Sequence, residues 1–243
     1  MRPGELLRLS RRPSGPRPLH FLHVGKTGGS AVKHALGLAP AETGRFVIHL
    51  DGEHRKTLHD VPEGEAAFFF VREPLARFVS AFYSRQRQGM PHDLHPWKDR
   101  EREAFATFHT ANALAEAISA RDQALRFEAR QAMRAIGHVN TQYAKWFESP
   151  RYFRSRRNDI VFVGRQETLD ADFERLKTLV GLPRETALPA DDVVAHRNPG
   201  GVDRSLSNLA RTNLEAWYRA DFEFLEFLAS HGFLARLAST VPS

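Results

Sequence analysis

A lysine in a glycine-rich loop is the first feature of this sequence that suggests chemistry. Residues 23–36 read HVGKTGGSAVKHAL, and the segment from residue 30 onward has the apolar spacing of a helix. Backbone N–H groups at a helix N-terminus, together with an ammonium group and hydroxyl side chains, favour the binding of an anion. The sequence therefore predicts an anion-binding loop with six contributing residues: Gly25, Lys26, Thr27, Gly28, Gly29 and Ser30.

The loop does not have the spacing of the P-loop found in nucleoside-triphosphate enzymes. That motif, G-x-x-x-x-G-K-[ST], carries a glycine five positions before its second glycine, and the residue five positions before Gly25 is His20. Two later apolar runs are followed by Arg72 and Arg165 rather than by an aspartate that could hold magnesium. A P-loop-type small-molecule kinase remains an alternative interpretation, and no metal site is predicted.

A second candidate site follows the apolar run AAFFFV (66–71). Arg72 comes directly after this run, at the carboxyl end of a predicted strand, where open α/β sheets bind ligands. Ser80 lies further along a helix that Pro74 begins. The flat guanidinium fork and the hydroxyl together suit a phosphate group. The structural alternatives are a surface ion pair between Arg72 and Glu73 and a Ser80 hydroxyl bonded back to its own helix.

Histidines are concentrated after the second predicted strand, in VIHLDGEHRKTLHDV (47–61). Histidine is the usual general base near neutral pH, and a loop at this strand end should face the same rim as the glycine-rich loop. His49 and His54 are therefore candidates for taking a proton from a hydroxyl group. We expect His59 to face solvent and His23 to brace the lysine loop.

The elements that must position these residues alternate between strand and helix. Apolar runs predict strands at 19–24, 45–50, 66–71 and 159–164. Helical spacing predicts helices at 30–37, from Pro74 onward, across 101–147 with an interruption at 119–121, at 169–182 and at 205–230. This alternation predicts an α/β fold with a mainly parallel central sheet flanked by helices. We expect residues 1–18 to form a basic flexible tail and residues 19–243 to form a single domain.

Composition limits the classes of protein to consider. The chain has 243 residues, of which 42% are apolar and 26% charged, as in globular proteins. No apolar stretch reaches the roughly 20 residues of a membrane span. Prolines interrupt the basic start where a secretory signal needs an apolar region, so we expect a cytoplasmic protein. The absence of cysteine excludes disulfides and zinc–thiolate sites.

The charge balance suits acidic ligands. The formal net charge is +6 and the isoelectric point is near 10.0, with 29 arginines against 6 lysines. Arginine binds phosphate and sulfate through its planar fork, although genomic base composition produces the same excess without any function. The segment RYFRSRRND (151–159) interleaves arginine with aromatic residues, as nucleic-acid binders do. A non-catalytic anion- or nucleic-acid-binding module is therefore a second alternative.

The two motifs together resemble the sulfotransferase family. FLHVGKTGGSAV (21–32) followed by FFFVREPLARFVSAFY (68–83) is similar to the bacterial carbohydrate-type branch related to heparan-sulfate 2-O-sulfotransferases. The second segment has the pattern R-x-P-x-x-R-x-x-S, and further matches occur at VFVGRQETLDADFERLK (161–177) and AHRNP (195–199). The resemblance covers most of residues 19–230 and implies the P-loop-like strand–loop–helix fold of the sulfotransferases.

The resemblance implies a co-substrate and the residues that bind it. Members of the family use 3′-phosphoadenosine 5′-phosphosulfate as the sulfuryl donor. The glycine-rich loop would hold the 5′-phosphosulfate, and Arg72 with Ser80 would hold the 3′-phosphate. In the same family reading, the residues that would help to enclose the nucleotide are Arg165, His196 and Asn198.

The resemblance also implies how the transfer proceeds. The sulfuryl group moves by in-line displacement, and Lys26 stabilises the negative charge that builds on the leaving phosphate. The family pattern aligns His54 with the base and leaves His49 second. The implied acceptor is a hydroxyl group of a carbohydrate, such as an oligosaccharide or glycolipid, and no nucleic-acid partner is expected. The sequence does not specify the acceptor or the oligomeric state.

Overall fold

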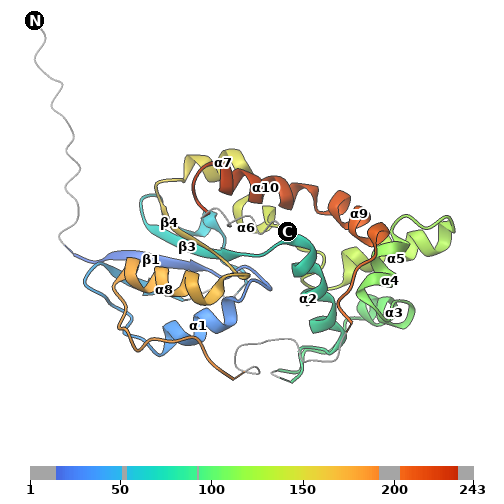
Figure 1. Ribbon diagram of the computed structural model, residues 1–243, viewed down its shortest axis with the longest axis horizontal. Helices are drawn as coiled ribbons and strands as arrows, with labels where there is room; N and C mark the ends of the chain where they lie inside the picture. Colours follow the sequence, from blue (N-terminus) through green and yellow to red (C-terminus); the bar gives the residue numbers. More distant parts are fainter. Residues whose placement is uncertain (1–14, 51–53, 92, 192–202, 235–243) are drawn as a thin grey trace, which may run out of the picture.

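A four-stranded parallel sheet forms the centre of the protein (Figure 1). The computed structural model describes residues 15–50, 54–91, 93–191 and 203–234. Within these ranges the sheet has the strand order β2-β1-β3-β4. Its members are β1 (Arg17–Leu22), β2 (Phe46–His49), β3 (Ala66–Val71) and β4 (Ile160–Arg165). The predicted α/β class with a parallel sheet flanked by helices is therefore confirmed.

Helices cover both faces of the sheet, because alternate side chains of the central strand point in opposite directions. All six residues of β3 are buried. Phe68 packs with apolar side chains of α1 and α8, whereas Phe69 packs with α6, α7 and α10. These covering helices are α1 (Gly29–Gly37), α6 (Ala144–Phe147), α7 (Pro150–Ser155), α8 (Leu169–Val180) and α10 (Arg219–Ser230). Figure 1 shows the two layers on opposite sides of the sheet.

A second apolar core lies beside the sheet, among helices drawn at the right of Figure 1. It is formed by α2 (Pro74–Gln86), α3 (Asp99–Thr107), α4 (Ala111–Ala117), α5 (Gln123–Ala135) and α9 (Asn208–Trp217). The interruption predicted at 119–121 is confirmed, because α4 ends at Ala117 and α5 begins at Gln123, whereas the break between α3 and α4 was not predicted. Thr110 and Asp122 cap the starts of α4 and α5. Their side chains accept hydrogen bonds from the N–H groups of Ala113 and Ala124, at 3.1 and 2.8 Å.

Element boundaries differ from the predicted ones at two places that bear on the domain. The single helix predicted at 205–230 is two helices, because α9 ends at Trp217 and α10 begins at Arg219. β1 begins at Arg17, whose N–H donates to the carbonyl of Arg45 at 2.9 Å, so the last two residues of the predicted tail belong to the sheet. Residues 1–14 lie outside the described part of the chain. No helix within the described part is long and apolar enough to cross a bilayer.

Candidate active site

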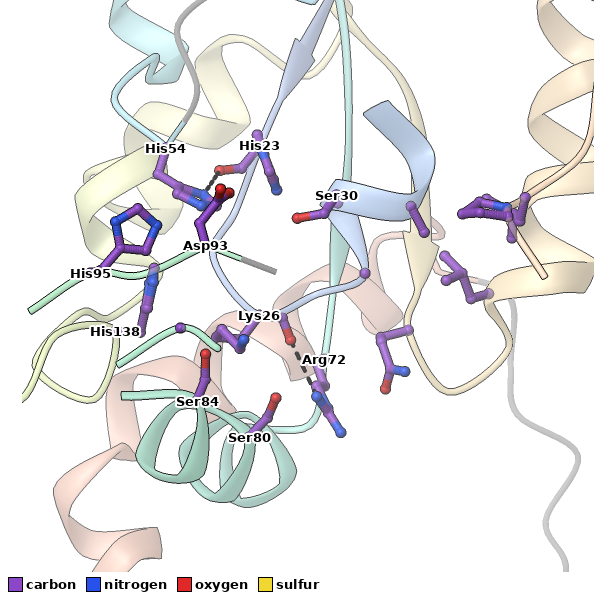
Figure 2. Close-up of a pocket in the computed structure, with 18 of the residues that line it drawn as sticks. His23, Lys26, Ser30, His54, Arg72, Ser80, Ser84, Asp93, His95 and His138 are labelled. Carbon is purple, nitrogen blue, oxygen red and sulfur yellow. Dashed lines mark hydrogen bonds between the residues drawn. The ribbon is translucent and has the colours of Figure 1, made fainter. Parts of the chain in front are cut away.

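A polar cavity of about 420 Å³ opens where β1 and β3 reach their carboxyl ends. Figure 2 shows Lys26 with His54, His95 and His138 on one side of it. Arg72 and Ser80 lie on another side. The predicted site residues that line the cavity are Lys26, Gly28, Gly29, Ser30, His54, Arg72 and Ser80. The residues that the sequence analysis did not select include Ser84, Asp93, His95, His138, Gln166 and Arg204. The loop and the strand-end arginine therefore meet in one place, as parallel strands require.

Four predicted residues are not among those that line the cavity. Thr27 is buried, and its hydroxyl donates to the carbonyl of Val24 at 2.9 Å, so it braces the loop from within. Gly25 lies beneath the ring of His138. The other two are His49 and Arg165, and the Arg165 backbone N–H donates to the carboxylate of Asp172. His196 and Asn198 lie outside the described residues.

Two residues of the glycine-rich loop have a left-handed backbone conformation. Lys26 has a φ of 67° and Gly28 a φ of 83°, and Gly28 is the N-cap of α1. A left-handed backbone is costly for a lysine, and such strain is concentrated at functional sites. A side chain at Gly29 would overlap the ring of His23. His23 therefore packs on the loop and braces it, as expected, while it also lines the cavity.

Lys26 is a cation surrounded by other cations. Burial, together with the positive charges of Arg72 and Arg87, lowers its pKa to about 8. The ammonium makes no hydrogen bond to any other described residue. Because a bound anion would offset both the burial and the repulsion, the cavity is suited to a negatively charged ligand.

Arg72 is fixed through its backbone and open through its side chain. Its N–H donates to the hydroxyl of Tyr143 at 2.8 Å, and that hydroxyl donates to the Arg72 carbonyl at 2.7 Å. One guanidinium nitrogen, Nη1, donates to the carbonyl of Lys26 at 3.4 Å, whereas the buried Nε has no hydrogen-bond partner among the described residues. Burial lowers the pKa of Arg72, yet arginine stays charged in proteins. A buried, unpaired donor of this kind indicates a place for a ligand.

The second arginine of the R-x-P-x-x-R-x-x-S pattern does not reach the cavity. Arg77 is buried, donates to Asp221 at 2.6 Å and to the carbonyl of Thr141 at 2.7 Å, and lies over the ring of Tyr143 at 4.9 Å. Asp221 also accepts from the N–H of Tyr143 at 2.8 Å. Arg77 therefore supports the tyrosine that holds Arg72 rather than contacting a ligand.

Three imidazole rings lie next to one another at the other side of the cavity. The ring of His54 is 4.1 Å from that of His23 and 5.3 Å from that of His138. His54 Nδ1 is 3.2 Å from the carbonyl of His23, and a carbonyl can only accept, so Nδ1 carries the hydrogen. The other nitrogen, Nε2, is then the basic one. Burial and the charge of Lys26 lower the pKa of His138 to about 3.

His49 belongs to a different cluster at the edge of the sheet. Its ring stacks on His20 at 4.9 Å. His20 in turn lies between Glu65, at 2.5 Å from Nε2, and Lys56, at 2.9 Å from Nδ1. Burial lowers the pKa of His20. The strand alternation thus directs His49 into a packed polar group rather than into the cavity.

The cavity residues that the sequence analysis missed come from segments distant in sequence. Asp93 and His95 belong to a turn that folds back after α2, where the His95 N–H donates to the Gln88 carbonyl at 2.6 Å and Arg85 donates to the His95 carbonyl at 3.1 Å. His138 lies between α5 and α6. None of these residues belongs to a strand–loop–helix motif, so only the tertiary structure brings them to the site.

The fold and the site together define a class of α/β protein with a ligand site at the carboxyl ends of parallel strands. A glycine-rich loop before a helix and a strand-end arginine, on adjacent parallel strands, are an arrangement suited to an anionic ligand. The described residues contain no group of three or more histidine or carboxylate side chains placed to hold a metal ion.

A comparison with protein families makes this class specific. A model of the sulfotransferase family matches residues 14–228. The chain therefore belongs to the sulfotransferase family, and the resemblance drawn from its motifs is confirmed at that level. No curated protein matches the chain.

Proposed function

We propose that this protein transfers a sulfuryl group from 3′-phosphoadenosine 5′-phosphosulfate to a hydroxyl group of a carbohydrate. One observation carries the proposal: Lys26 and the guanidinium of Arg72, whose Nε has no hydrogen-bond partner among the described residues, share a cavity at the ends of neighbouring strands. Family membership supports sulfuryl transfer in general. The nucleotide would supply the sulfuryl group, and the chain would bind, orient and activate the two reactants.

The cavity offers separate positions for the two phosphate groups of the nucleotide. The N-terminus of α1, with Gly28, Gly29 and Ser30 at the wall, would hold the 5′-phosphosulfate. Arg72 and Ser80 would hold the 3′-phosphate, and the unpaired Nε of Arg72 is available for that bond. Both residues also line a smaller adjoining pocket, with Arg204 and Arg211 on its wall. These cations support recognition of a second phosphate.

Lys26 is suited to stabilise the leaving phosphate. Negative charge builds on the bridging oxygen as the sulfuryl group departs, and a fixed ammonium there is worth more in the transition state than in the ground state. Without a ligand the pKa of Lys26 is about 8. A bound polyanion raises that pKa, so the ammonium would be fully charged when the donor is present.

His54 is the better supported of the two candidate bases. It lines the cavity, whereas His49 stacks on His20 in another cluster. The hydrogen bond from His54 Nδ1 to the His23 carbonyl fixes the tautomer, so that Nε2 is the nitrogen that would take the proton of the acceptor hydroxyl. This is the same orientation logic by which a third group aligns a catalytic histidine.

The polar wall around the histidines supports a hydroxyl-rich acceptor. Asp93 and His95 line the cavity beside His54, Ser84 lines it on the side of Lys26 and Ser80, and the three provide both donors and acceptors of hydrogen bonds. A sugar with several hydroxyl groups can satisfy such a wall, because each hydroxyl donates one bond and accepts others. The choice of a carbohydrate rests on this polarity and on the sequence resemblance.

Ligand-dependent melting and a transfer assay test the proposal. 3′-Phosphoadenosine 5′-phosphate should raise the melting temperature, because a ligand that binds only the folded state stabilises it, whereas ATP with magnesium should not. Radiolabelled donor should then label at least one acceptor in a panel of heparosan oligosaccharides, cellobiose, a neutral glycolipid and p-nitrophenol. If ATP with magnesium stabilises the protein and 3′-phosphoadenosine 5′-phosphate does not, the result would support the kinase alternative. If p-nitrophenol is the one acceptor labelled, the result would contradict a carbohydrate acceptor.

A further inference from the structure

His138 lies in the cavity in a strained conformation. It has a φ of 63°, which is rare for a residue with a side chain. Its ring sits against Gly25, where an added Cβ would be 2.8 Å from Nδ1. A glycine at position 25 is therefore required for His138 to occupy this position. The two residues form a matched pair, although they are far apart in the sequence.

Buried contacts hold the turn that carries this strained histidine. The Gly137 N–H donates to the carboxylate of Glu101 at 2.9 Å. The Tyr218 hydroxyl donates to the carbonyl of Val139 at 2.7 Å. The turn is thus fixed on both sides of residue 138, as strained residues must be in order to persist. This anchoring keeps the imidazole directed into the cavity rather than into solvent.

The surroundings of His138 keep its ring uncharged. Lys26 and His54 face it within the site, and Arg85 and Arg77 of α2 add further positive charge. Burial, together with these positive groups, lowers the pKa of His138 to about 3. The imidazole makes no hydrogen bond with another described residue. It is therefore a neutral donor and acceptor, without a hydrogen-bond partner in the described part of the chain, next to the proposed reacting atoms.

We propose that His138 is a catalytic residue that donates a hydrogen bond from its Nε2–H group to an oxygen of the transferring sulfuryl group. Nδ1 faces Gly25, so Nε2 is the nitrogen that remains for a ligand. The hydrogen stays on Nε2 throughout, and no covalent bond to His138 forms or breaks. A neutral imidazole can occupy this position beside Lys26 without the repulsion that an imidazolium would suffer. This role rests on the proposed function and extends it.

The neutrality of His138 separates its role from that of His54. An imidazole that resists protonation down to about pH 3 is a weak base and does not compete for the acceptor proton. A hydrogen-bond donor aimed at an oxygen whose charge changes during transfer affects turnover rather than the binding of the nucleotide. Loss of one such donor typically lowers turnover by about 10²–10³-fold.

The test compares His138→Ala and His138→Gln with His59→Ala, a control histidine that is exposed and lies outside the cavity. Glutamine can place an amide N–H near the position of Nε2 but cannot act as a base. We expect His138→Ala to lose about 100-fold in sulfuryl transfer to the best acceptor of the panel. We expect His138→Gln to retain turnover within about tenfold of wild type. All three variants should bind 3′-phosphoadenosine 5′-phosphate within about twofold of wild type by calorimetry.

Each other outcome overturns the proposal. Wild-type turnover in His138→Ala means that the ring contributes nothing to the transfer. Equal losses in the Ala and Gln variants, with melting temperatures preserved, assign His138 to packing. Loss of the acid limb of the pH–rate profile in His138→Gln makes His138 the base. If the wild-type protein neither binds the nucleotide nor transfers sulfate, the proposed function itself fails, and the role of His138 fails with it.

Gly25→Ala provides an independent variant at the other member of the pair. The new methyl group would displace the His138 ring, because a Cβ at this position would be 2.8 Å from Nδ1. Turnover should fall in the same range as for His138→Ala, and the double variant should be no slower than either single one. Additive losses would contradict a shared cause.

Discussion

The hydroxyl of Tyr143 bonds to both backbone groups of Arg72: it accepts from the N–H at 2.8 Å and donates to the carbonyl at 2.7 Å. It thereby satisfies the hydrogen-bonding groups of the backbone between the end of β3 and the start of α2. Burial raises the pKa of Tyr143 well above its usual range. The hydroxyl therefore keeps its hydrogen at any working pH, and the orientation of Arg72 does not vary with pH.

Tyr143→Phe should weaken nucleotide binding without removing any group that contacts the nucleotide. Two buried hydrogen bonds are lost, which should lower the free energy of unfolding by about 1–3 kcal/mol. Arg72 should then lose its fixed orientation, so affinity for 3′-phosphoadenosine 5′-phosphate should fall. Urea denaturation and calorimetry measure the two effects. Tyr152→Phe is the control, because its hydroxyl lies outside the cavity and accepts a hydrogen bond of 3.0 Å from Arg156. Equal nucleotide affinities of the two variants would contradict the orienting role.

Arg72→Ala should remove a charge-assisted bond to the 3′-phosphate. Such bonds contribute about 1.5–3 kcal/mol, so affinity for 3′-phosphoadenosine 5′-phosphate should fall by roughly 10- to 150-fold. Adenosine 5′-phosphate lacks the 3′-phosphate, and its weaker binding should change much less. Calorimetry with both nucleotides measures this discrimination, with Arg102→Ala as an exposed control. Unchanged discrimination would remove Arg72 from the site.

Lys26→Met should lower turnover far more than it weakens nucleotide binding. Methionine keeps the length of the side chain but cannot stabilise charge on the bridging oxygen. Steady-state transfer and calorimetry on the same variant separate the two contributions. Turnover within a few-fold of wild type would mean that the loop only holds the phosphate and that the lysine has no role in the chemical step.

The lowered pKa of Lys26 also predicts how stability depends on pH. The ammonium has a pKa of about 8 in the folded protein and 10.5 in the reference state, so between these values the unfolded chain binds more protons. Stability should therefore rise with pH over that window relative to Lys26→Met. Below pH 8 the charged lysine is a destabilising group, and Lys26→Met should melt at a higher temperature than wild type. Matching pH dependences in the two proteins would show that Lys26 has an ordinary pKa.

Local sequence patterns predicted the sheet and the loop well, because their determinants are local. The run AAFFFV gives β3 with both of its predicted bounds, and α1 begins at Gly29, one residue before its predicted start at Ser30. The helical region after α2 was predicted less well, since caps such as Thr110 decide where one helix ends and the next begins. Apolar spacing alone does not contain that information.

The remaining parts of the site depend on contacts between distant segments. No local motif in the sequence marks His138 as a site residue. Gly25 was predicted to bind an anion, and the sequence does not reveal its contact with His138. Arg77 matches a family pattern for a phosphate site, yet its guanidinium binds Asp221. The sequence showed which residue types were available, whereas the packing decides which of them face the cavity.

The choice between His54 and His49 can be tested directly, because the two residues belong to one short segment and have separate environments. If His54 takes the acceptor proton, His54→Ala should lower turnover by about 10²–10⁴-fold and leave nucleotide affinity nearly intact. The wild-type rate should fall on the acid side, because a protonated imidazole cannot accept a proton, and His54→Ala should lose that limb. His49→Ala should keep both turnover and the acid limb, since His49 stacks on His20 outside the cavity. The reverse pattern, an inactive His49→Ala with an active His54→Ala, would make His49 the base despite its position. Two active, folded variants would mean that neither histidine takes the proton, and would leave the hydrogen bond from His54 to the His23 carbonyl as a purely structural contact.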